Sequence, residues 1–334
     1  MKLLHIAKGR PASRVWTPPF ISALKELGEL QIVENGAQLS PEEGLELMRS
    51  CDVLLTSWNS LSIPKALAAD RGRLRYICNV TGSVRGWVPL EIVEAGIPVT
   101  NWGDAPDFRI AEGAMTLLLA AVKNLRRRIK MIEDGGWNPD GSLFSSTLEG
   151  MNIGIYGCGA IGRRFISFLK PFAPVIRIYD PYVSDIPEGC SRVSSLEELF
   201  TQSEAIVIHA GLSNETRGSI TANLLAKLPD NGIIINTARG AIIDQAALFA
   251  ELERGRLIAG LDVLEPDWLP ADHPARHWPS LILTAHDIGT ATSREQEQIK
   301  LQRMHRICLD NLRRFAAGEP LVFLIDRDRW LRST

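Results

Sequence analysis

No apolar run in the sequence is long enough to cross a bilayer. The longest, from Met115 to Val122, falls far short of the roughly 20 residues that a membrane helix needs. The N-terminus carries one early lysine, but its apolar stretch is too short for a signal peptide and no cleavage pattern follows it. We therefore expect neither a membrane segment nor a secretory leader.

Cysteine is scarce, and neither sign of charge is in excess. The five cysteines are odd in number, widely spaced and without a C-x-x-C pair, which is typical of free thiols in a reducing compartment such as the cytoplasm. Lys and Arg total 37 against 39 Asp and Glu. Because no global field attracts nucleic acid or an anionic membrane, we expect neither as a partner. No metal is expected either.

The length and composition are those of an ordinary globular protein. The 334 residues predict about two domains. A hydrophobic content of 45% and a charged content of 23% exclude disorder, collagen-like repeats and coiled coils. Short β-rich runs alternate with helical patterns almost throughout, which favours α/β layers with parallel strands.

The predicted strands form two series, separated by a turn-rich break at Gly135–Gly141. Two long helices are expected at about 107–130 and 293–317, and Leu321–Ile325 is a candidate for a final strand. The first series of strands consists of Lys2–Ala7, Leu30–Val33, Asp52–Thr56, Arg75–Val80 and Ile97–Thr100. The second consists of Asn152–Tyr156, Val175–Tyr179, Ala205–His209, Gly232–Asn236, Leu257–Asp262 and Leu281–Thr284.

A G-x-G-x-x-G motif, Gly157–Gly162, follows the predicted strand Asn152–Tyr156 and opens a helix. In this motif the first glycine, Gly157, permits the tight turn from strand to helix. Gly159 lets the backbone approach a pyrophosphate, and Gly162 lets the helix pack closely on the strand. The free amides of the helix N-terminus then face the anion. The motif alone is weak evidence, but its position predicts a dinucleotide site.

Asp180 ends the next strand and selects between the two nicotinamide dinucleotides. A carboxylate at this position binds the adenosine ribose hydroxyls and repels a 2′-phosphate. The residues that follow it offer no Arg or Lys to hold such a phosphate, and Arg177 points to the other face of the strand. The sequence therefore predicts NAD rather than NADP.

Three polar positions follow later strands, at the strand ends where open α/β sheets bind ligands. They are Arg239, the acidic stretch Asp262–Asp267, and His286. Taken singly, Arg239 is a surface charge and His286 a structural loop histidine. Their order and spacing together favour a shared catalytic site over these separate structural interpretations.

At this point the chain resembles the D-isomer-specific 2-hydroxyacid dehydrogenase family over nearly its whole length. The resemblance implies two doubly wound parallel-sheet domains, a flavodoxin-like substrate domain of residues 1–103 and 291–334 and a Rossmann NAD-binding domain of residues 104–290, with substrate in the cleft between them. The segments that carry it are Gly157–Gly162, His209–Arg217, Asn236–Gly240, Gly260–Val263 and Thr284–Gly289.

The resemblance also implies the catalytic roles. His286 would be the acid and base at the keto oxygen, and Arg239 would bind the substrate carboxylate and polarise the carbonyl. Most members carry a Glu as the partner of the histidine, where this chain has Asp267. We expect Asp267 to be that partner, with Glu265 as the alternative.

The resemblance implies that NAD is the cofactor. It also implies which residues of this chain contact the NAD. Asp262 would contact the nicotinamide carboxamide, and Gly289 would let the backbone approach the ring. We expect His209 to pack in the fold or to support a residue that contacts the cofactor. The full set of expected cofactor residues is Gly157, Gly159, Ala160, Ile161, Gly162, Asp180, His209, Thr216, Thr237, Ala238, Asp262 and Gly289.

The substrate side resembles the family less closely. Members carry a glycine-rich turn whose amides hold the substrate carboxylate, and here the amides of Gly82, Ser83 and Val84 take that place in a turn with fewer glycines. Trp58, Trp102 and Arg85 lie near predicted strand ends in the same domain. For each tryptophan we favour packing over contact with a substrate side chain.

The resulting hypothesis is reversible hydride transfer between NAD(H) and a D-2-hydroxy acid or its 2-keto acid, by a homodimer that pairs through the cofactor domain. One alternative is an NAD(H)-sensing, corepressor-like binding protein. Another is a dehydrogenase of the formate or phosphite type, although the formate type places an amide where Asp267 stands. The substrate and the physiological direction stay open.

Overall fold

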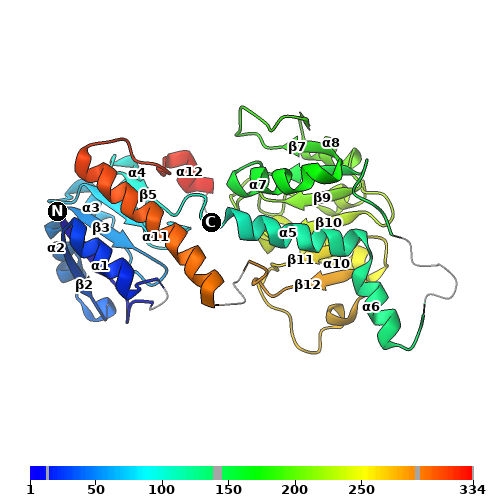
Figure 1. Ribbon diagram of the computed structural model, residues 1–334, viewed down its shortest axis with the longest axis horizontal. Coiled ribbons are helices and arrows are strands. Elements are labelled where there is room, and N and C mark those ends of the chain that lie inside the picture. The colour runs from blue at the N-terminus through cyan, green and yellow to red at the C-terminus, as the bar shows by residue number, and fades with distance from the viewer. Residues whose placement is uncertain (13–14, 138–144, 290–293, 333–334) are drawn as a thin grey trace. The chain divides into compact units, whose positions relative to one another are not determined.

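The computed structural model describes the chain except residues 13–14, 138–144, 290–293 and 333–334, and the chain divides into two compact units (Figure 1). One unit comprises Met1–Ala105 and Ala291–Thr334, and the other comprises Pro106–Thr290. No helix among the described residues combines the length and the apolar character that a membrane crossing requires.

The first unit contains a parallel sheet of five strands in the order β2-β1-β3-β4-β5. This order is that of a flavodoxin-like, doubly wound sheet, so the predicted fold class is confirmed for this unit. Its strands are β1 (Lys2–Ile6), β2 (Glu29–Val33), β3 (Val53–Thr56), β4 (Tyr76–Asn79) and β5 (Val99–Thr100).

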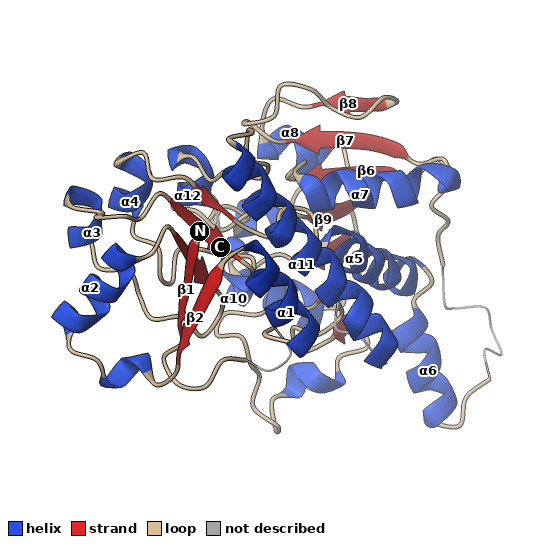
Figure 2. Ribbon diagram, turned by 60° about the vertical axis from the view of Figure 1, so that its left-hand side comes forward, coloured by secondary structure: helices blue, strands red, loops and turns tan. Residues whose placement is uncertain are grey.

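Helices cover both faces of this sheet. Leu3 and Leu4 are neighbours on β1 and point into two separate buried clusters, as strand geometry requires. The first cluster lies under α1 (Pro18–Leu27) and α11 (Arg294–Ala317), which lie side by side in Figure 2. The second lies under α2 (Pro41–Ser50), α3 (Ala66–Ala69), α4 (Leu90–Glu94) and α12 (Arg327–Arg332).

The second unit contains a parallel sheet of seven strands in the order β12-β11-β10-β9-β6-β7-β8. The chain runs outward from β6 in one direction and returns beside it with β9, which is the topological switch point of a Rossmann fold. Its strands are β6 (Asn152–Tyr156), β7 (Val175–Tyr179), β8 (Cys190–Arg192), β9 (Ala205–Ile208), β10 (Ile233–Asn236), β11 (Ile258–Leu261) and β12 (Leu281–Leu283).

Two buried clusters again lie on the two faces of the sheet. One packs under α5 (Asp107–Val122) and α7 (Ala160–Leu169), and the other under α8 (Leu196–Thr201), α9 (Ala222–Leu225) and α10 (Gln245–Glu253). The remaining helix, α6 (Leu125–Glu133), has no buried residue.

Two expectations about secondary structure were wrong, and one strand was not predicted. The helix expected over 107–130 is two helices, because Asn124 adopts a left-handed φ of 49° between α5 and α6. Leu321–Ile325 is not a strand, since Phe323 has a φ of 58° and only Leu324 makes an isolated bridge. The strand β8 was not foreseen. Part of the expected break, Asn138–Gly141, lies outside the described residues.

Candidate active site

Arg239 lies on the turn that follows β10, and the side chain of Asn236 shapes this turn. The amide nitrogen Nδ2 of Asn236 donates to the carbonyl of Arg239 at 2.9 Å, and its Oδ1 accepts from the amide of Ala238 at 3.0 Å. Asn236 itself is buried. The sequence interpretation did not single out this asparagine, although its place at the end of a strand was a signal for it.

Gly240 brings the Arg239 turn against the acidic loop that follows β11. A Cβ atom at Gly240 would lie 2.1 Å from the carbonyl carbon of Leu264, so no larger residue fits there. The amide of Leu264 in turn donates to Oδ1 of Asp267 at 3.1 Å. The absence of a side chain at Gly240 therefore sets Arg239 and Asp267 on adjoining loops.

His286 lies on the loop after β12 in a strained conformation. Ala285 and His286 have φ values of 46° and 58°, a left-handed region that costs a non-glycine residue roughly 1–2 kcal/mol. The buried Asp262 holds the loop in place. Its Oδ1 accepts from the Thr284 hydroxyl at 2.7 Å and the Asp287 amide at 3.0 Å, and its carbonyl accepts from the His286 amide at 2.6 Å.

The structure joins His286 to Asp267. The ring nitrogen Nδ1 of His286 forms a hydrogen bond with Oδ2 of Asp267, and 48% and 47% of the two side chains are exposed. Glu265, the alternative partner, is tied through its backbone to the side chain of Gln245 and makes no described contact with the imidazole. With Nδ1 engaged, Nε2 is the ring nitrogen left for a reactant.

Burial and charge act on this group of residues in opposite directions. Burial alone raises the pKa of Asp267, but the hydrogen bonds from His286 and the Leu264 amide outweigh it. The positive charge of Arg239 adds to them, so the pKa of Asp267 lies below its ordinary value. Burial lowers the pKa of Arg239, and the charge of Asp267 opposes that shift. Asp267 is therefore ionised at neutral pH, and its charge favours the charged form of Arg239.

The glycine-rich turn after β6 has three distinct glycine environments. Gly157 has a φ of 96°, and a Cβ atom there would lie 2.4 Å from the amide nitrogen of Ala210. A Cβ atom at Gly162 would lie 2.4 Å from the carbonyl oxygen of Gly157. At Gly159, by contrast, a Cβ atom would meet no atom of the described residues within 4 Å. Two of the glycines are thus required by the fold, whereas the third leaves space beside the turn.

The helix that follows and the acid at the end of β7 border that space. Helix α7 begins with Ala160 and Ile161 and has no side-chain cap, so its first amides are open to an anion. Asp180 accepts from the amide of Cys158, on the glycine-rich turn, at 2.7 Å and from the amide of Tyr182 at 2.9 Å. Its carboxylate therefore lies against the turn, as a residue that binds ribose hydroxyls must.

Arg192 also reaches this region, and the sequence interpretation did not include it. Its guanidinium donates to the carbonyls of Asp180 at 2.9 Å and Val183 at 2.7 Å. No local pattern signals this contact, because it depends on β8 pairing with β7. The guanidinium is bound to backbone oxygens of the loop.

Two expected cofactor residues have buried polar atoms with no hydrogen-bond partner in the part of the chain that the structure describes. These atoms are Oγ1 of Thr237, on the turn after β10, and Nε2 of His209, after β9. Burial lowers the pKa of His209 to about 3, so its ring is neutral. Unpartnered buried polar atoms are rare in native proteins. Together with the open space at Gly159, these atoms fit a bound dinucleotide that supplies their missing partners.

Thr216 and Gly289, which were also expected to contact the cofactor, have local roles in the described structure. The hydroxyl of Thr216 donates to the carbonyl of Gly211 at 2.7 Å and accepts from the amide of Ser213 at 2.8 Å, which closes the loop after β9. A Cβ atom at Gly289 would lie 2.5 Å from Cδ1 of Ile110 on α5. Packing and loop closure therefore account for these two residues.

The expected carboxylate-binding turn lies in the first unit, after β4. The amides of Gly82, Ser83 and Val84 donate to no group among the described residues, and Gly82 and Val84 are buried. The side chain of Asn79 fixes the turn by donating to the carbonyls of Thr81 at 2.8 Å and Gly82 at 3.2 Å. Three successive amides with no acceptor are the donors that an anion requires.

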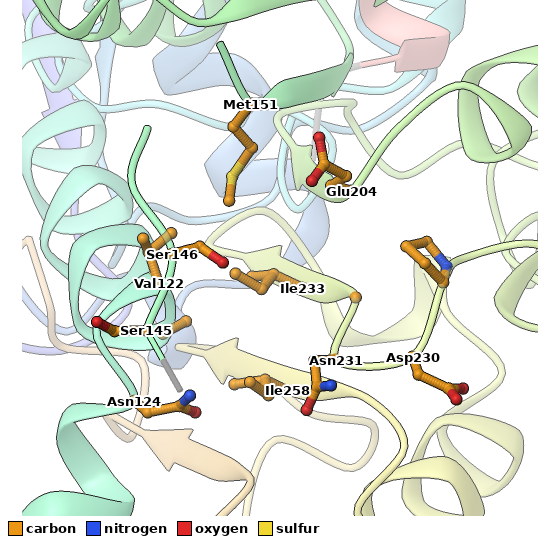
Figure 3. Close-up of a pocket in the computed structure, with 13 residues that line it drawn as sticks. Val122, Asn124, Ser145, Ser146, Met151, Glu204, Asp230, Asn231, Ile233 and Ile258 are labelled. Carbon is orange, nitrogen blue, oxygen red and sulfur yellow. The ribbon is translucent and has the colours of Figure 1, made fainter. Parts of the chain in front are cut away.

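A recess of about 290 Å³ lies at the amino ends of strands of the second sheet, opposite the carboxyl ends that carry the candidate site (Figure 3). It adjoins the first residues of β10 and β11, whereas Arg239 and Asp262 follow the last residues of these strands. Ligands of open α/β sheets bind at the carboxyl ends of the strands. The recess is therefore separate from the candidate site. Its lining includes Val122, Met151, Glu204, Asn231, Ile233 and Ile258.

The family of the chain follows from a comparison with protein-family models. The model described as D-isomer specific 2-hydroxyacid dehydrogenase, NAD binding domain, matches residues 115–287, which is more than half of the chain. The chain belongs to this family. The resemblance in the sequence is thereby confirmed, NAD is the cofactor, and the protein is an NAD-dependent oxidoreductase of the 2-hydroxyacid dehydrogenase type.

Named relatives agree on the family and differ in substrate. The chain is 31% identical over 282 residues to D-3-phosphoglycerate dehydrogenase of Methanocaldococcus jannaschii, across 83% of this chain but only 52% of that protein. It is 30% identical over 329 residues to glyoxylate reductase of Thermofilum pendens, across 95% of this chain and 94% of that protein. Among solved structures, a glyoxylate reductase from Paecilomyes thermophila has a TM-score of 0.75 at 25% identity, across 98% of this chain and 99% of that one.

Proposed function

We propose that the protein interconverts a D-2-hydroxy acid and its 2-keto acid, with His286 as acid and base, Asp267 as its partner and Arg239 as the cation for the substrate. The observation that carries the proposal is the hydrogen-bonded pair of His286 and Asp267 beside the Arg239 turn. All three follow β10, β11 and β12, which are neighbours in the NAD-binding sheet.

His286 moves the proton in this mechanism. NAD, when bound, accepts the hydride from C2 of the hydroxy acid or returns it to C2 of the keto acid. In the reducing direction, Nε2 of the His286 imidazolium donates its proton to the keto oxygen, which becomes the hydroxyl. Asp267 accepts at Nδ1, holds the ring in one orientation and stabilises its charged form. In the oxidising direction, neutral His286 takes the hydroxyl proton.

Arg239 and the turn after β4 bind the substrate. The planar, permanently charged guanidinium of Arg239 suits both the substrate carboxylate and the polarised keto oxygen. The amides of Gly82, Ser83 and Val84 supply further donors to the carboxylate, and their lack of described acceptors supports this role. The net charge of the chain is only −2, so the protein as a whole has no field that attracts a small anion. The attraction must come from these few local groups.

The test is an NADH-oxidation assay with purified protein over glyoxylate, hydroxypyruvate, pyruvate and longer 2-keto acids, repeated with NADPH. We expect turnover with at least one keto acid and faster turnover with NADH. Oxidation of formate by NAD⁺ in place of keto-acid reduction would favour the formate type. Absence of all turnover, with assembly that depends on NAD(H), would favour the corepressor-like alternative and contradict the proposal.

We also propose that the protein is a cytoplasmic homodimer that pairs through α6. None of the five cysteines forms a disulfide, which suits a reducing compartment. Leu125, Ile129 and Ile132 lie on one face of α6 and are 46%, 48% and 49% exposed. Trp137, beyond the helix, is 83% exposed. A second copy of the chain is the partner that would cover this apolar face.

Light scattering during size-exclusion chromatography tests the dimer. The wild-type protein is expected to elute with twice the mass of the chain, and Ile129→Asp with the mass of one chain, because a charge is costly in an apolar interface. Glu133→Gln, an exposed change on the same helix, is the matched control and should leave the mass unchanged. A monomeric wild type would contradict the proposal.

A further inference from the structure

Two tryptophans lie at the carboxyl end of the first sheet. Trp58 follows β3 and Trp102 follows β5, and their rings meet edge to face, with centroids 5.7 Å apart and planes at 87°. Trp102 packs against the buried cluster under α1 and α11. Trp58 is 43% exposed. Core packing, which the sequence favoured for both tryptophans, therefore accounts for Trp102 and for only part of the Trp58 side chain.

This pair adjoins the turn with the free amides. A Cβ atom at Gly82 would lie 2.6 Å from the indole ring of Trp102, and the amide of Trp102 donates to the carbonyl of Thr81 at 3.2 Å. The side chain of Asn101 also donates to the carbonyl of Gly82, at 3.0 Å. The turn and the Trp102 loop thus pack against each other, and the ring of Trp58 contacts the ring of Trp102.

The chemistry of a 2-keto acid connects these two features. Its side chain begins at C3, the second carbon from the carboxylate carbon, so a carboxylate held by the Gly82–Val84 amides leaves the side chain close by. Glyoxylate has only a hydrogen atom at that position. An indole surface binds aromatic and apolar groups well and gains nothing from a hydrogen atom.

The cation that follows the turn in the sequence has its partners on another element. Arg85, the cation nearest to the turn in the sequence, has its guanidinium 5.1 Å from the ring centroid of Trp330. This stacking turns Arg85 to the C-terminal helix α12. In this structure the guanidinium of Arg85 is thus engaged with residues of α12.

We propose that Trp58, supported by Trp102, forms the binding surface for the substrate side chain, and that the enzyme prefers 2-keto acids with an aromatic or extended apolar side chain. This inference rests on the proposed function. It assigns to Trp58 a part in choosing the substrate and no part in the proton transfer.

The experiment compares kcat/KM for phenylpyruvate, 4-methyl-2-oxopentanoate, glyoxylate and 2-oxoglutarate in the wild type, Trp58→Ala and Trp58→Phe. For the wild type we expect phenylpyruvate to exceed glyoxylate by about tenfold or more, the order of one aromatic contact. Trp58→Ala should lower kcat/KM for phenylpyruvate about tenfold and leave glyoxylate within about twofold. Trp58→Phe should keep most of the phenylpyruvate activity, because the aromatic surface is retained.

The outcomes separate this inference from the proposed function. A wild type that prefers glyoxylate or 2-oxoglutarate, or a Trp58→Ala variant that loses activity equally on all four acids, would overturn the role of Trp58 and leave keto-acid reduction intact. A wild type that reduces none of the acids would overturn the proposed function itself. A thermal melt of each variant shows that it is folded.

Discussion

The carboxyl ends of the two sheets carry different kinds of chemistry. In the second unit, the loops after β10, β11 and β12 bring together ionisable side chains, namely Arg239, Asp267 and His286. In the first unit, the loops after β3, β4 and β5 present backbone amides and indole rings. Under the two proposals above, proton transfer and substrate choice belong to separate parts of the chain, so substitutions should separate them.

The largest expected effect comes from removing the acid and base. His286→Ala should lower kcat for every keto acid by about 10²–10⁴-fold, the usual contribution of general acid catalysis. NADH binding, measured by fluorescence titration, should be unchanged. His277→Ala, which removes an exposed histidine elsewhere in the same unit, is the control. Unchanged turnover in His286→Ala would break the assignment of proton transfer to the second unit.

A smaller loss is expected from Asp267→Asn. Removing a charged hydrogen-bond partner costs about 1.5–3 kcal/mol, or roughly ten- to hundredfold in kcat/KM. Glu265→Gln, the matched control on the same loop, should retain wild-type activity. Equal losses in both variants would show that either carboxylate supports His286, contrary to the geometry.

The pH profile of Asp267→Asn tests whether the charge of Asp267 contributes to catalysis. The wild type and the variant should differ at the acid end of the kcat/KM profile, because only the wild type has a carboxylate beside His286 that protonation can neutralise. In the wild type, the lowered pKa of Asp267 keeps the carboxylate ionised, and its contribution is lost only when the pH falls through that lowered value. The same loss of kcat/KM at the acid end in the wild type and in Asp267→Asn would contradict the electrostatic role of Asp267.

The glycine-rich turn allows a test of cofactor binding apart from folding. Gly159→Ala places a Cβ atom where the protein itself has nothing within 4 Å, so the melting temperature should be unchanged while the Kd for NADH rises about tenfold. Gly157→Ala is the contrast. Its φ of 96° and the 2.4 Å approach to Ala210 should lower the melting temperature. Unaltered NADH binding in Gly159→Ala would place the dinucleotide elsewhere.

The smallest effect concerns the choice of dinucleotide. Asp180→Ala should lower the ratio of kcat/KM with NADH to that with NADPH by about tenfold, because it removes the charge that repels a 2′-phosphate. Substrate preference among keto acids should not change. If the NADH to NADPH ratio stays at the wild-type value, the carboxylate does not face the ribose.

Much of the fold was predictable because most strands are short runs of apolar, β-branched residues between turn or helix signals. The bounds of β6 and β7, Asn152–Tyr156 and Val175–Tyr179, agree with the prediction to the residue. The break after α5 was not predictable, because the helical periodicity continues across it and a single left-handed residue, Asn124, interrupts it. The polar edge strand β8 lacked the apolar run that marks the others.

The candidate site was predictable in its residue types and less so in its contacts. The order of Arg239, the acidic stretch and His286 pointed to the loops, but the choice between Asp267 and Glu265 depends on the path of the loop, which the sequence does not encode locally. The same holds for Asn236, whose role requires the turn to fold back on its side chain.

The division of tasks between the two sheets is tested most directly by one ratio, kcat/KM for phenylpyruvate over kcat/KM for glyoxylate, in the wild type, Asp267→Asn and Trp58→Ala. We expect Asp267→Asn to lower both constants by the same factor and keep the ratio, and Trp58→Ala to lower the ratio about tenfold. A ratio that changes in Asp267→Asn and stays constant in Trp58→Ala would contradict the account.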